Sequence, residues 1–190
     1  WQLLCWALSA LGLWLAGDAR AACSAPIRMA MQSWAPYIYP NDKGQAAGGD
    51  VEIMQAIFRE AGCTLSVIPQ VPGKRNMAML QAGELDMIPG ASDLPERHAF
   101  AWFSAAYRSE TNSLFCLAPK GQKYQDIAGF AALLERKISL LSPAQGWYGD
   151  DHAAYIDRLK LAKLNSSFEG IPQGLVMLSR GRGELLVADR

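Results

Sequence analysis

The order of hydrophobic and polar positions predicts alternating strands and helices in the first half of the chain. Short apolar runs at residues 27–31, 64–68 and 85–88 are typical of buried strands. Between them, residues 50–61 and 73–82 carry apolar side chains three or four positions apart, which indicates helices with one buried face. This order of strands and helices favours a parallel sheet with helices on its faces.

Residues at the expected ends of these elements indicate how the helices begin. We expect Asp50 to cap the first helix, after a polar, glycine-rich turn at residues 41–49. Pro95 suits the first turn of another helix, because the amide proton that proline lacks would be unpaired there. We expect Ser92 or Asp93 to cap that turn, directly after the third strand.

The second half of the chain repeats this alternation. It predicts strands at residues 113–118, 138–141 and 185–188, a helix at residues 130–135, and a helix capped by Asp150 that runs to about Leu161. A weak internal echo joins the two halves, because residues 79–86 and 177–184 both read as the end of a helix, a glycine and the start of a strand. This echo indicates two lobes of similar build.

The first 22 residues have the composition of a secretory signal. Residues 1–16 are almost all apolar, and the pattern Ala19-Arg20-Ala21 places small residues around an expected cleavage site close to Ala22. A membrane anchor is the alternative, although the apolar run is shorter than the ~20 residues that a span requires. We therefore expect a signal peptide at residues 1–22.

Charge and cysteine content narrow the class of protein. The 190 residues carry 18 Lys and Arg against 18 Asp and Glu, so neither nucleic acid nor an acidic membrane surface is an expected partner. Cys23 and Cys63 each precede a predicted strand, and we expect them to form a disulfide if those strands are parallel neighbours. We expect Cys116 to be a buried free thiol. The cysteine spacings fit no zinc site, and no cofactor is expected.

One stretch, residues 90–107, carries a recognisable motif. Its residues are Gly90, Ser92, Pro95, Glu96, Arg97, Trp102, Phe103, Ser104 and Tyr107. The stretch resembles the signature of the family 3 extracellular solute-binding proteins, the polar amino-acid receptors of ABC importers. In that signature Thr stands at the position of Leu94 and Pro at the position of Ala106, so the ligand need not be a standard amino acid.

The resemblance implies an α/β fold of the periplasmic binding protein-like type II, with two lobes of mainly parallel sheets and a hinge. It places lobe 1 at residues 23–113, and the hinge strand with an incomplete lobe 2 at residues 114–190, with the family's C-terminal return missing. It also implies a periplasmic, monomeric substrate-binding component of an ABC importer. Such a protein binds an amino acid or a similar small carboxylate between its lobes and delivers it to a permease in the inner membrane.

The resemblance further implies ligand-binding residues on both lobes. The matching positions are Trp34, Tyr37, Gly90, Ser92, Arg97, Trp147, Tyr148 and Asp189. Gly90, Ser92 and Arg97 would hold the ligand carboxylate, since a planar guanidinium can donate two parallel hydrogen bonds to it. Trp34 would stack on the ligand, and Asp189 would bind its ammonium group. The alternatives are ordinary packing for the aromatic residues and a charge-balanced strand end for Asp189.

Two other functions on the same fold stay open. An enzyme similar to a cyclohexadienyl dehydratase or a lytic transglycosylase would need a titratable group over the ligand. The plausible groups are Glu96, His98, Glu184 and Asp189, and they form no catalytic motif, so we expect no enzyme. A sensor module of a signalling protein would require a transmembrane segment after Arg190. Fold alone does not decide between these functions.

Overall fold

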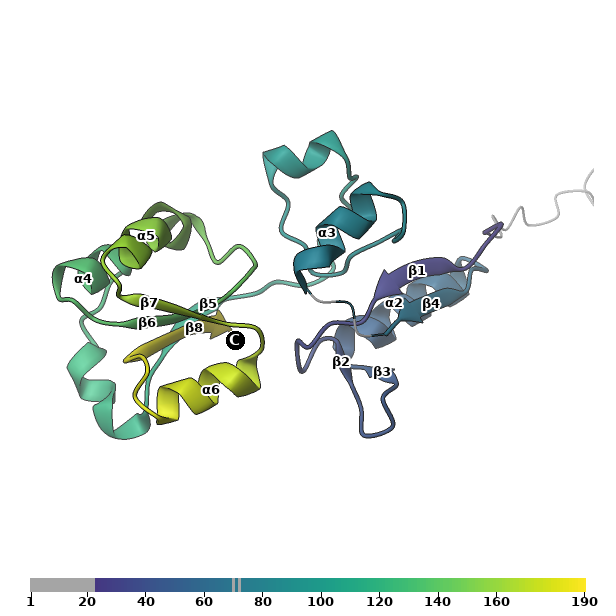
Figure 1. Cartoon of the computed structure of the whole chain (residues 1–190). Helices are drawn as coiled ribbons and strands as arrows, with labels where there is room; N and C mark the ends of the chain where they lie inside the picture. Colours follow the sequence, from purple (N-terminus) through teal and green to yellow (C-terminus); the bar gives the residue numbers. More distant parts are fainter. Residues whose placement is uncertain (1–22, 70, 72) are drawn as a thin grey trace, which may run out of the picture.

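The computed structural model describes residues 23–69, 71 and 73–190, and its strands and helices form two lobes (Figure 1). The predicted signal peptide at residues 1–22 lies outside the described residues. Within the described part of the chain, no helix has the length and apolar character that crossing a bilayer requires. The chain passes from the first lobe to the second just before strand β5 (Asn112–Phe115).

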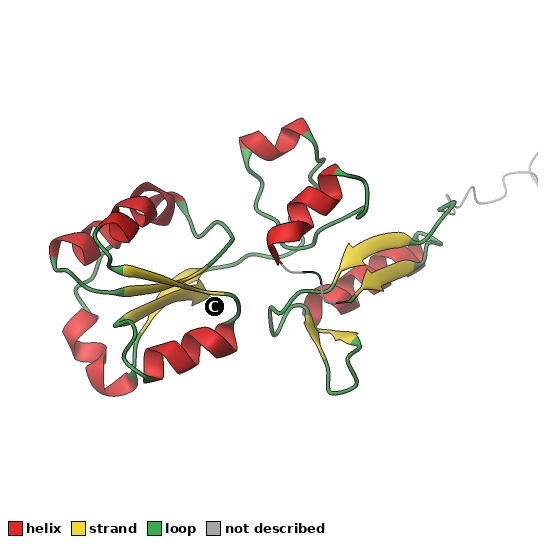
Figure 2. Cartoon of the chain, in the orientation of Figure 1, coloured by secondary structure: helices red, strands yellow, loops and turns green. Residues whose placement is uncertain are grey.

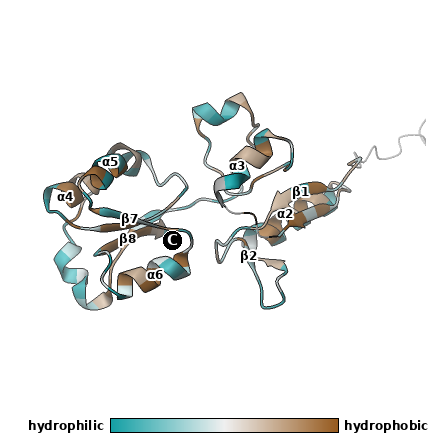
Figure 3. Ribbon diagram, viewed as in Figure 1, coloured by the Kyte–Doolittle hydropathy of each residue, from teal (hydrophilic) through white to brown (hydrophobic). Residues whose placement is uncertain are grey.

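The first lobe is built on a parallel pair of strands. Its elements are β1 (Ile27–Ala30), β2 (Tyr39–Pro40), β3 (Ala46–Ala47), α2 (Gly49–Glu60), β4 (Leu65–Ile68), α3 (Gly73–Gln81) and the 3-10 helix η2 (Pro95–Ala99). β1 and β4 run parallel, as predicted, from Ile27 beside Leu65 to Ala30 beside Ile68. β2 and β3 form a short antiparallel pair. β2 lies just before the polar turn predicted at residues 41–49, and β3 lies within it. The core is a cluster of four buried side chains, Met29, Ile38, Val51 and Met54. β1 and α2 are among the hydrophobic parts of the ribbon (Figure 3).

The strand predicted at residues 85–88 is not formed, and that prediction is wrong. The apolar run is buried at Leu85, but its backbone makes only a single bridge, from Met87 to β1. A side chain takes over part of the ladder, because the Asp86 carboxylate accepts hydrogen bonds from the backbone N–H and the guanidinium of Arg28. The apolar pattern therefore indicated burial correctly and strand pairing incorrectly.

The second lobe is a four-stranded sheet with helices on both faces (Figure 2). After β5, its elements are η3 (Ala118–Tyr124), α4 (Phe130–Glu135), β6 (Leu140–Pro143), α5 (Asp150–Leu161), β7 (Asn165–Phe168), α6 (Ile171–Ser179) and β8 (Leu185–Asp189). The strand order is β5-β8-β6-β7, in which β6 is parallel to both neighbours and β5 is antiparallel to β8. α4 and α5 cover one face of the sheet and α6 covers the other (Figure 1).

Successive side chains of β8 divide the core between the two faces of this sheet. Leu185 and Val187 pack in the cluster that includes residues of α4 and α5, whereas Leu186 and Ala188 pack in the cluster that includes α6. This alternation is the period of two expected of a strand, and a strand buried on both faces has a continuous apolar sequence. The next residue, Asp189, ends the strand at the carboxyl edge of the sheet.

The aspartates expected to cap helices do not do so. Asp50 and Asp150 lie in the first turns of α2 and α5, and each of these helices starts after a glycine without a side-chain cap. η2 likewise starts without a cap from Ser92 or Asp93. The Asp93 carboxylate pairs with the His98 imidazole at 2.6 Å instead, and Asp50 has a more distant partner, described below.

Cys23 and Cys63, the pair expected from the sequence, form a disulfide with their Cα atoms 5.1 Å apart. The parallel pairing of β1 and β4 explains the approach, because each cysteine lies shortly before one of these strands. Cys116 is a free, half-buried thiol that packs against the core of the second lobe. The disulfide therefore ties together the two strand starts at the outer end of the first lobe.

Candidate ligand-binding cleft

A cleft of about 630 Å³ lies between the two lobes. Its first wall comes from the loop after β1, the start of α3, and residues 88–92 with Arg97; its second wall comes from residues 143–148 after β6, residues 168–171 at the start of α6, and Asp189. Most of these segments follow the carboxyl ends of parallel strands. In open α/β sheets, ligands bind in the crevice outside those ends.

Trp34 and Asp189 link the two walls of the cleft. The indole Nε1 of Trp34, in the first lobe, donates to both carboxylate oxygens of Asp189, at the end of β8, at 3.2 Å each. Two residues that the family resemblance implied at a ligand site are thus brought together across 155 positions of the chain. These hydrogen bonds orient the Asp189 carboxylate beside the indole of Trp34.

Gly90 lies directly against the ring of Trp34. Its φ of +65° is a left-handed conformation, and a Cβ atom at this position would lie 2.6 Å from Cζ3 of the indole. Only glycine therefore satisfies both the backbone conformation and the contact. Tyr37 lies beside the same indole, with ring centroids 4.8 Å apart, but it does not line the described cleft. Tyr37 thus packs against Trp34 and supports the position of its indole ring.

The guanidinium of Arg108 packs beside these aromatic rings. It lies 4.0 Å from the centroid of Tyr37 and 4.8 Å from that of Trp34, within the range of cation–π interactions. Its Nε and Nη2 donate to the two carboxylate oxygens of Asp50 at 2.8 and 3.1 Å, and Asp50 is fully buried. Its Nη1 forms an ion pair with Glu110, which lines the cleft.

Burial and charge act in opposite directions within this ion-pair network. Burial by itself lowers the pKa of Arg108, but the hydrogen bonds and charge of Asp50 raise the pKa above its usual range. Burial raises the pKa of Glu110, while Arg108 lowers it and Asp189 adds to the rise. Sequence reasoning did not single out Asp50, Arg108 or Glu110 as parts of the site, because no local pattern shows which distant side chains pair.

The predicted carboxylate anchors come together on the first wall. Gly90, Ser92 and Arg97 all line the cleft. Nη1 of Arg97 donates to the backbone carbonyl of Ser92 at 2.7 Å, which fixes the plane of the guanidinium. Among the described residues, the Arg97 side chain donates no other hydrogen bond, so its remaining N–H groups can bind a ligand. Arg97 lies on η2, the short 3-10 helix that starts at Pro95, where the sequence predicted the first turn of a helix.

Trp147 and Tyr148 line the cleft from the second lobe, in the loop after β6. Tyr148 packs edge-on against His152, with ring centroids 5.5 Å apart. Burial raises the pKa of the Tyr148 hydroxyl, and the carboxylates of Asp189 and Glu110 raise it further, so the hydroxyl stays protonated near neutral pH. It can therefore act as a hydrogen-bond donor within the cleft.

The walls approach each other at two further points. A Cβ atom on Gly170, before α6, would lie 3.6 Å from Oγ of Ser33, and one on Gly73, at the start of α3, would lie 3.4 Å from Oε1 of Gln145. Gln145 and Asn76, an asparagine on α3, also line the cleft, and sequence reasoning missed both. No signal in the sequence distinguishes these amides from surface residues.

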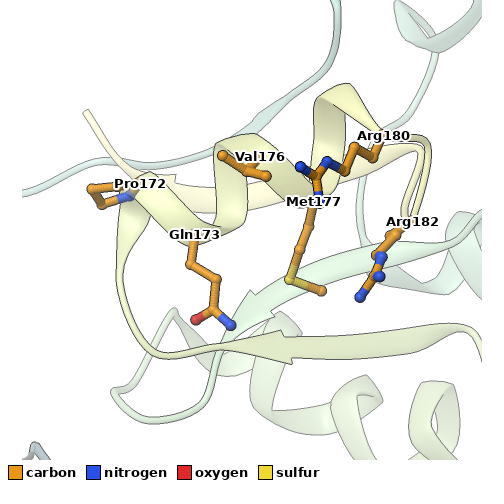
Figure 4. A pocket seen from close by; sticks show the side chains of 6 residues that line it. All are labelled: Pro172, Gln173, Val176, Met177, Arg180 and Arg182. Carbon is orange, nitrogen blue, oxygen red and sulfur yellow. The ribbon is translucent and has the colours of Figure 1, made fainter.

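The described residues offer weaker candidates for a functional site elsewhere. No group of three or more His, Cys, Asp and Glu among them could hold a metal ion. A second hollow, of about 450 Å³, lies on α6 and just beyond it (Figure 4). Its lining is Pro172, Gln173, Val176, Met177, Arg180 and Arg182, all from one lobe. The cleft between the lobes is therefore the candidate site.

Comparisons with known proteins bear on the fold and the family of the chain. No curated protein matches the sequence. The ancestral amino acid-binding protein AncCDT-1, a precursor of cyclohexadienyl dehydratase, is 19% identical with a TM-score of 0.70, and the match covers 87% of this chain and 70% of that one. An ABC uptake transporter substrate-binding protein from Streptococcus pneumoniae with bound histidine is 21% identical with a TM-score of 0.69, covering 87% and 66%. Arginine-bound truncated ArgBP from T. maritima is 19% identical with a TM-score of 0.68, covering 90% and 75%.

At these identities the structural likeness shows the fold, which is the two-lobed type II periplasmic binding protein fold. The sequence itself matches the family model of the bacterial extracellular solute-binding proteins, family 3, over residues 27–185. That range includes β1, the Gly90 loop, Arg97 and nearly all of the second lobe. The chain with this interlobe cleft therefore belongs to the family 3 bacterial extracellular solute-binding proteins.

Proposed function

We propose that this protein is the substrate-binding component of an ABC importer and that it binds an amino acid or a similar small carboxylate between its lobes. One observation carries the proposal: a cation and an anion, Arg97 and Asp189, line the same cleft from opposite lobes. A zwitterion presents a carboxylate and an ammonium group that match this pair. The names of the structural neighbours, which include histidine-bound and arginine-bound proteins, agree with such a ligand.

In this proposal each wall holds one end of the ligand. Arg97 donates two parallel hydrogen bonds to the carboxylate, together with donors at Gly90 and Ser92. Asp189 accepts from the ammonium group and stays oriented by Trp34, which packs against the ligand backbone. Trp147 and Tyr148 contact the ligand from the second lobe. A ligand held from both lobes stabilises their approach, and a permease in the inner membrane would recognise the resulting form.

Cellular location and organisation are part of the same proposal. The family is extracellular, and the Cys23–Cys63 disulfide is of the kind that persists in oxidising compartments, which supports the periplasm. We propose that residues 1–22 direct export, that lobe 1 covers residues 23–113, and that residues 114–190 supply the hinge strand and lobe 2. We further propose that the protein acts as a monomer.

The positions of the titratable groups support binding rather than catalysis. Of the four candidates that the sequence offered, Asp189 lines the cleft. His98 pairs with Asp93, and Glu184 accepts hydrogen bonds from Lys123 and Tyr124 inside the second lobe. Glu96 is exposed on η2. A recovered ligand that is chemically unchanged after incubation with the protein would agree with binding alone.

Isothermal titration calorimetry tests the anchor, using the amino acid that gives the largest thermal shift in a panel of the twenty standard ones. Arg97→Ala should weaken binding by about thirtyfold or more, because losing one partner of a desolvated charge pair costs on the order of 2–5 kcal/mol. Arg97→Lys should also weaken binding, since lysine has no planar fork. The matched control is Arg59→Ala, which removes an exposed arginine from the last turn of α2. An Arg97→Ala variant within threefold of wild type, or no binding of any amino acid, would contradict the proposal.

A further inference from the structure

Two amide side chains in the cleft have buried polar atoms that no described residue pairs. Oδ1 of Asn76 and Nε2 of Gln145 are both buried without a hydrogen-bond partner, and both residues line the cleft. Asn76 is only 4% exposed. Buried polar atoms of folded proteins nearly always have a partner, so each such atom requires an explanation.

The two amides come from opposite lobes, and the Gln145 side chain lies near the start of the helix that carries Asn76. Asn76 is on α3, three residues after Gly73, and residues three apart share a helix face. Gln145 follows β6 in the second lobe, and its Oε1 lies 3.4 Å from the place of a Cβ on Gly73. The Gln145 side chain therefore lies against the first turn of α3, close to the turn that carries Asn76.

Three charged side chains that line the cleft already have partners within the protein. Arg97 donates to the Ser92 carbonyl, Asp189 accepts from Trp34, and Glu110 pairs with Arg108. These pairs also supply the charges that a zwitterion requires. The two amides add no charge, so what they contribute to a ligand is a pair of directional hydrogen bonds.

The two unpaired atoms indicate which chemical group of a ligand could form hydrogen bonds with both of them. Oδ1 of Asn76 is an acceptor and Nε2 of Gln145 is a donor. A carboxamide or a ureido group offers both a donor and an acceptor and can pair with both atoms at once. A carboxylate has only acceptors and an ammonium or guanidinium has only donors, so either would leave one atom unpaired. An aliphatic side chain would leave both unpaired.

We propose that Asn76 and Gln145 form a specificity subsite that selects an amino acid whose side chain ends in a neutral carboxamide or ureido group. This inference rests on the proposed function, in which Arg97 and Asp189 hold the α-carboxylate and the α-ammonium groups. The inference adds two residues that determine which amino-acid side chain the ligand carries. The cleft volume of about 630 Å³ lies in the usual range for small-ligand sites.

The first test compares ligands on the wild-type protein by isothermal titration calorimetry. The probes are L-glutamine, L-citrulline, L-glutamate, L-arginine and L-norvaline. L-glutamine or L-citrulline should bind about tenfold or more tightly than the other three, because those ligands leave a buried amide atom unpaired. If L-glutamate, L-arginine or L-norvaline binds as tightly as the better amide ligand, the inference is overturned while the proposed amino-acid binding stands.

The second test removes the amides with side chains of similar size. Asn76→Leu and Gln145→Met should each lower the affinity for L-glutamine by about tenfold and leave that for L-norvaline unchanged or higher. Gln81→Met is the matched control, because Gln81 is an exposed amide at the end of the same helix, α3. Circular dichroism verifies folding, and if Asn76→Leu does not fold, the loop variant Gln145→Met decides.

The outcomes separate this inference from the proposed function. A glutamine-to-norvaline affinity ratio that stays within twofold of wild type in the folded variants overturns the subsite, even if Arg97→Ala abolishes binding. A wild-type protein that binds none of the probes and none of the standard amino acids overturns the proposed function and the subsite with it. A ratio that collapses in Gln145→Met and not in Gln81→Met supports the subsite.

Discussion

The ion pair between Asp50 and Arg108 provides the sharpest stability prediction. Asp50 is completely buried, and the Arg108 side chain is only 16% exposed. Two hydrogen bonds of 2.8 and 3.1 Å join them, and Glu110 is the second carboxylate on the same guanidinium. The pair joins the start of α2 to the segment that leads into the second lobe, and it packs beside the ring of Trp34.

Asp50→Ala should destabilise the protein by about 3 kcal/mol. Removing one partner of a buried ion pair typically costs about 3–5 kcal/mol, because the remaining charge stays desolvated. Glu110 retains part of the compensation, and Arg108 keeps some contact with water, so we expect the lower end of this range. For a chain of this size, each kcal/mol shifts the melting temperature by about 2–4 °C, which predicts a fall of roughly 6–12 °C.

Thermal unfolding followed by circular dichroism measures this effect. Asp42→Ala is the matched control, because it removes an exposed aspartate from the turn between β2 and β3. The double variant Asp50→Leu/Arg108→Met should be more stable than Asp50→Ala, since it leaves no desolvated guanidinium and the Glu110 carboxylate is partly exposed to water. A fall of under about 2 °C for Asp50→Ala, or a double variant less stable than the single one, would refute the reasoning.

Three further predictions concern other parts of the chain. Gly90→Ala should weaken ligand binding in calorimetry by about tenfold or more, because the new methyl group displaces the ring of Trp34; unchanged affinity would show that the contact is not needed. Cys63→Ser should lower the free energy of unfolding by about 3–4 kcal/mol in urea titrations, since the disulfide closes a loop across 40 positions. A hydrogen bond from Lys123 lowers the pKa of Glu184 from its usual 4.5 to about 2, so its stabilising effect is complete above the usual pKa and is lost as the pH falls towards 2. Between the usual pKa of 4.5 and a pH of about 2, the melting temperature of Glu184→Gln should therefore fall less than the melting temperature of the wild type.

Local patterns in the sequence were sufficient for most of the regular elements. The helix at residues 130–135 has the bounds that its pattern predicts, and helices α2, α3 and α5 differ from theirs by a residue at most. Propensity and periodicity act over a few residues, so they can be read without the fold. β7 was missed because its sequence, Asn-Ser-Ser-Phe, is mostly polar, as suits a strand at the edge of a sheet. β6 was predicted two residues too early.

Much of the site could also be anticipated, but only through the family motif. Gly90, Ser92 and Arg97 are close in sequence and all line the cleft. Trp34, Trp147, Tyr148 and Asp189 line it as well. Tyr37 packs behind Trp34 instead. A motif preserves the identity of residues at matched positions, whereas the neighbours of each residue depend on how closely the elements pack around it.

The tertiary structure alone decided the pairing of side chains. Asp50 has the sequence features of a helix cap, yet it is buried against Arg108, which lies 58 positions away. Asn76 and Gln145 have no local signature, and both line one cleft because α3 and the loop after β6 form its opposite walls. Hydrogen bonds and ion pairs act over a few ångströms in space, whatever the separation along the chain, so only the packed fold determines which partners meet.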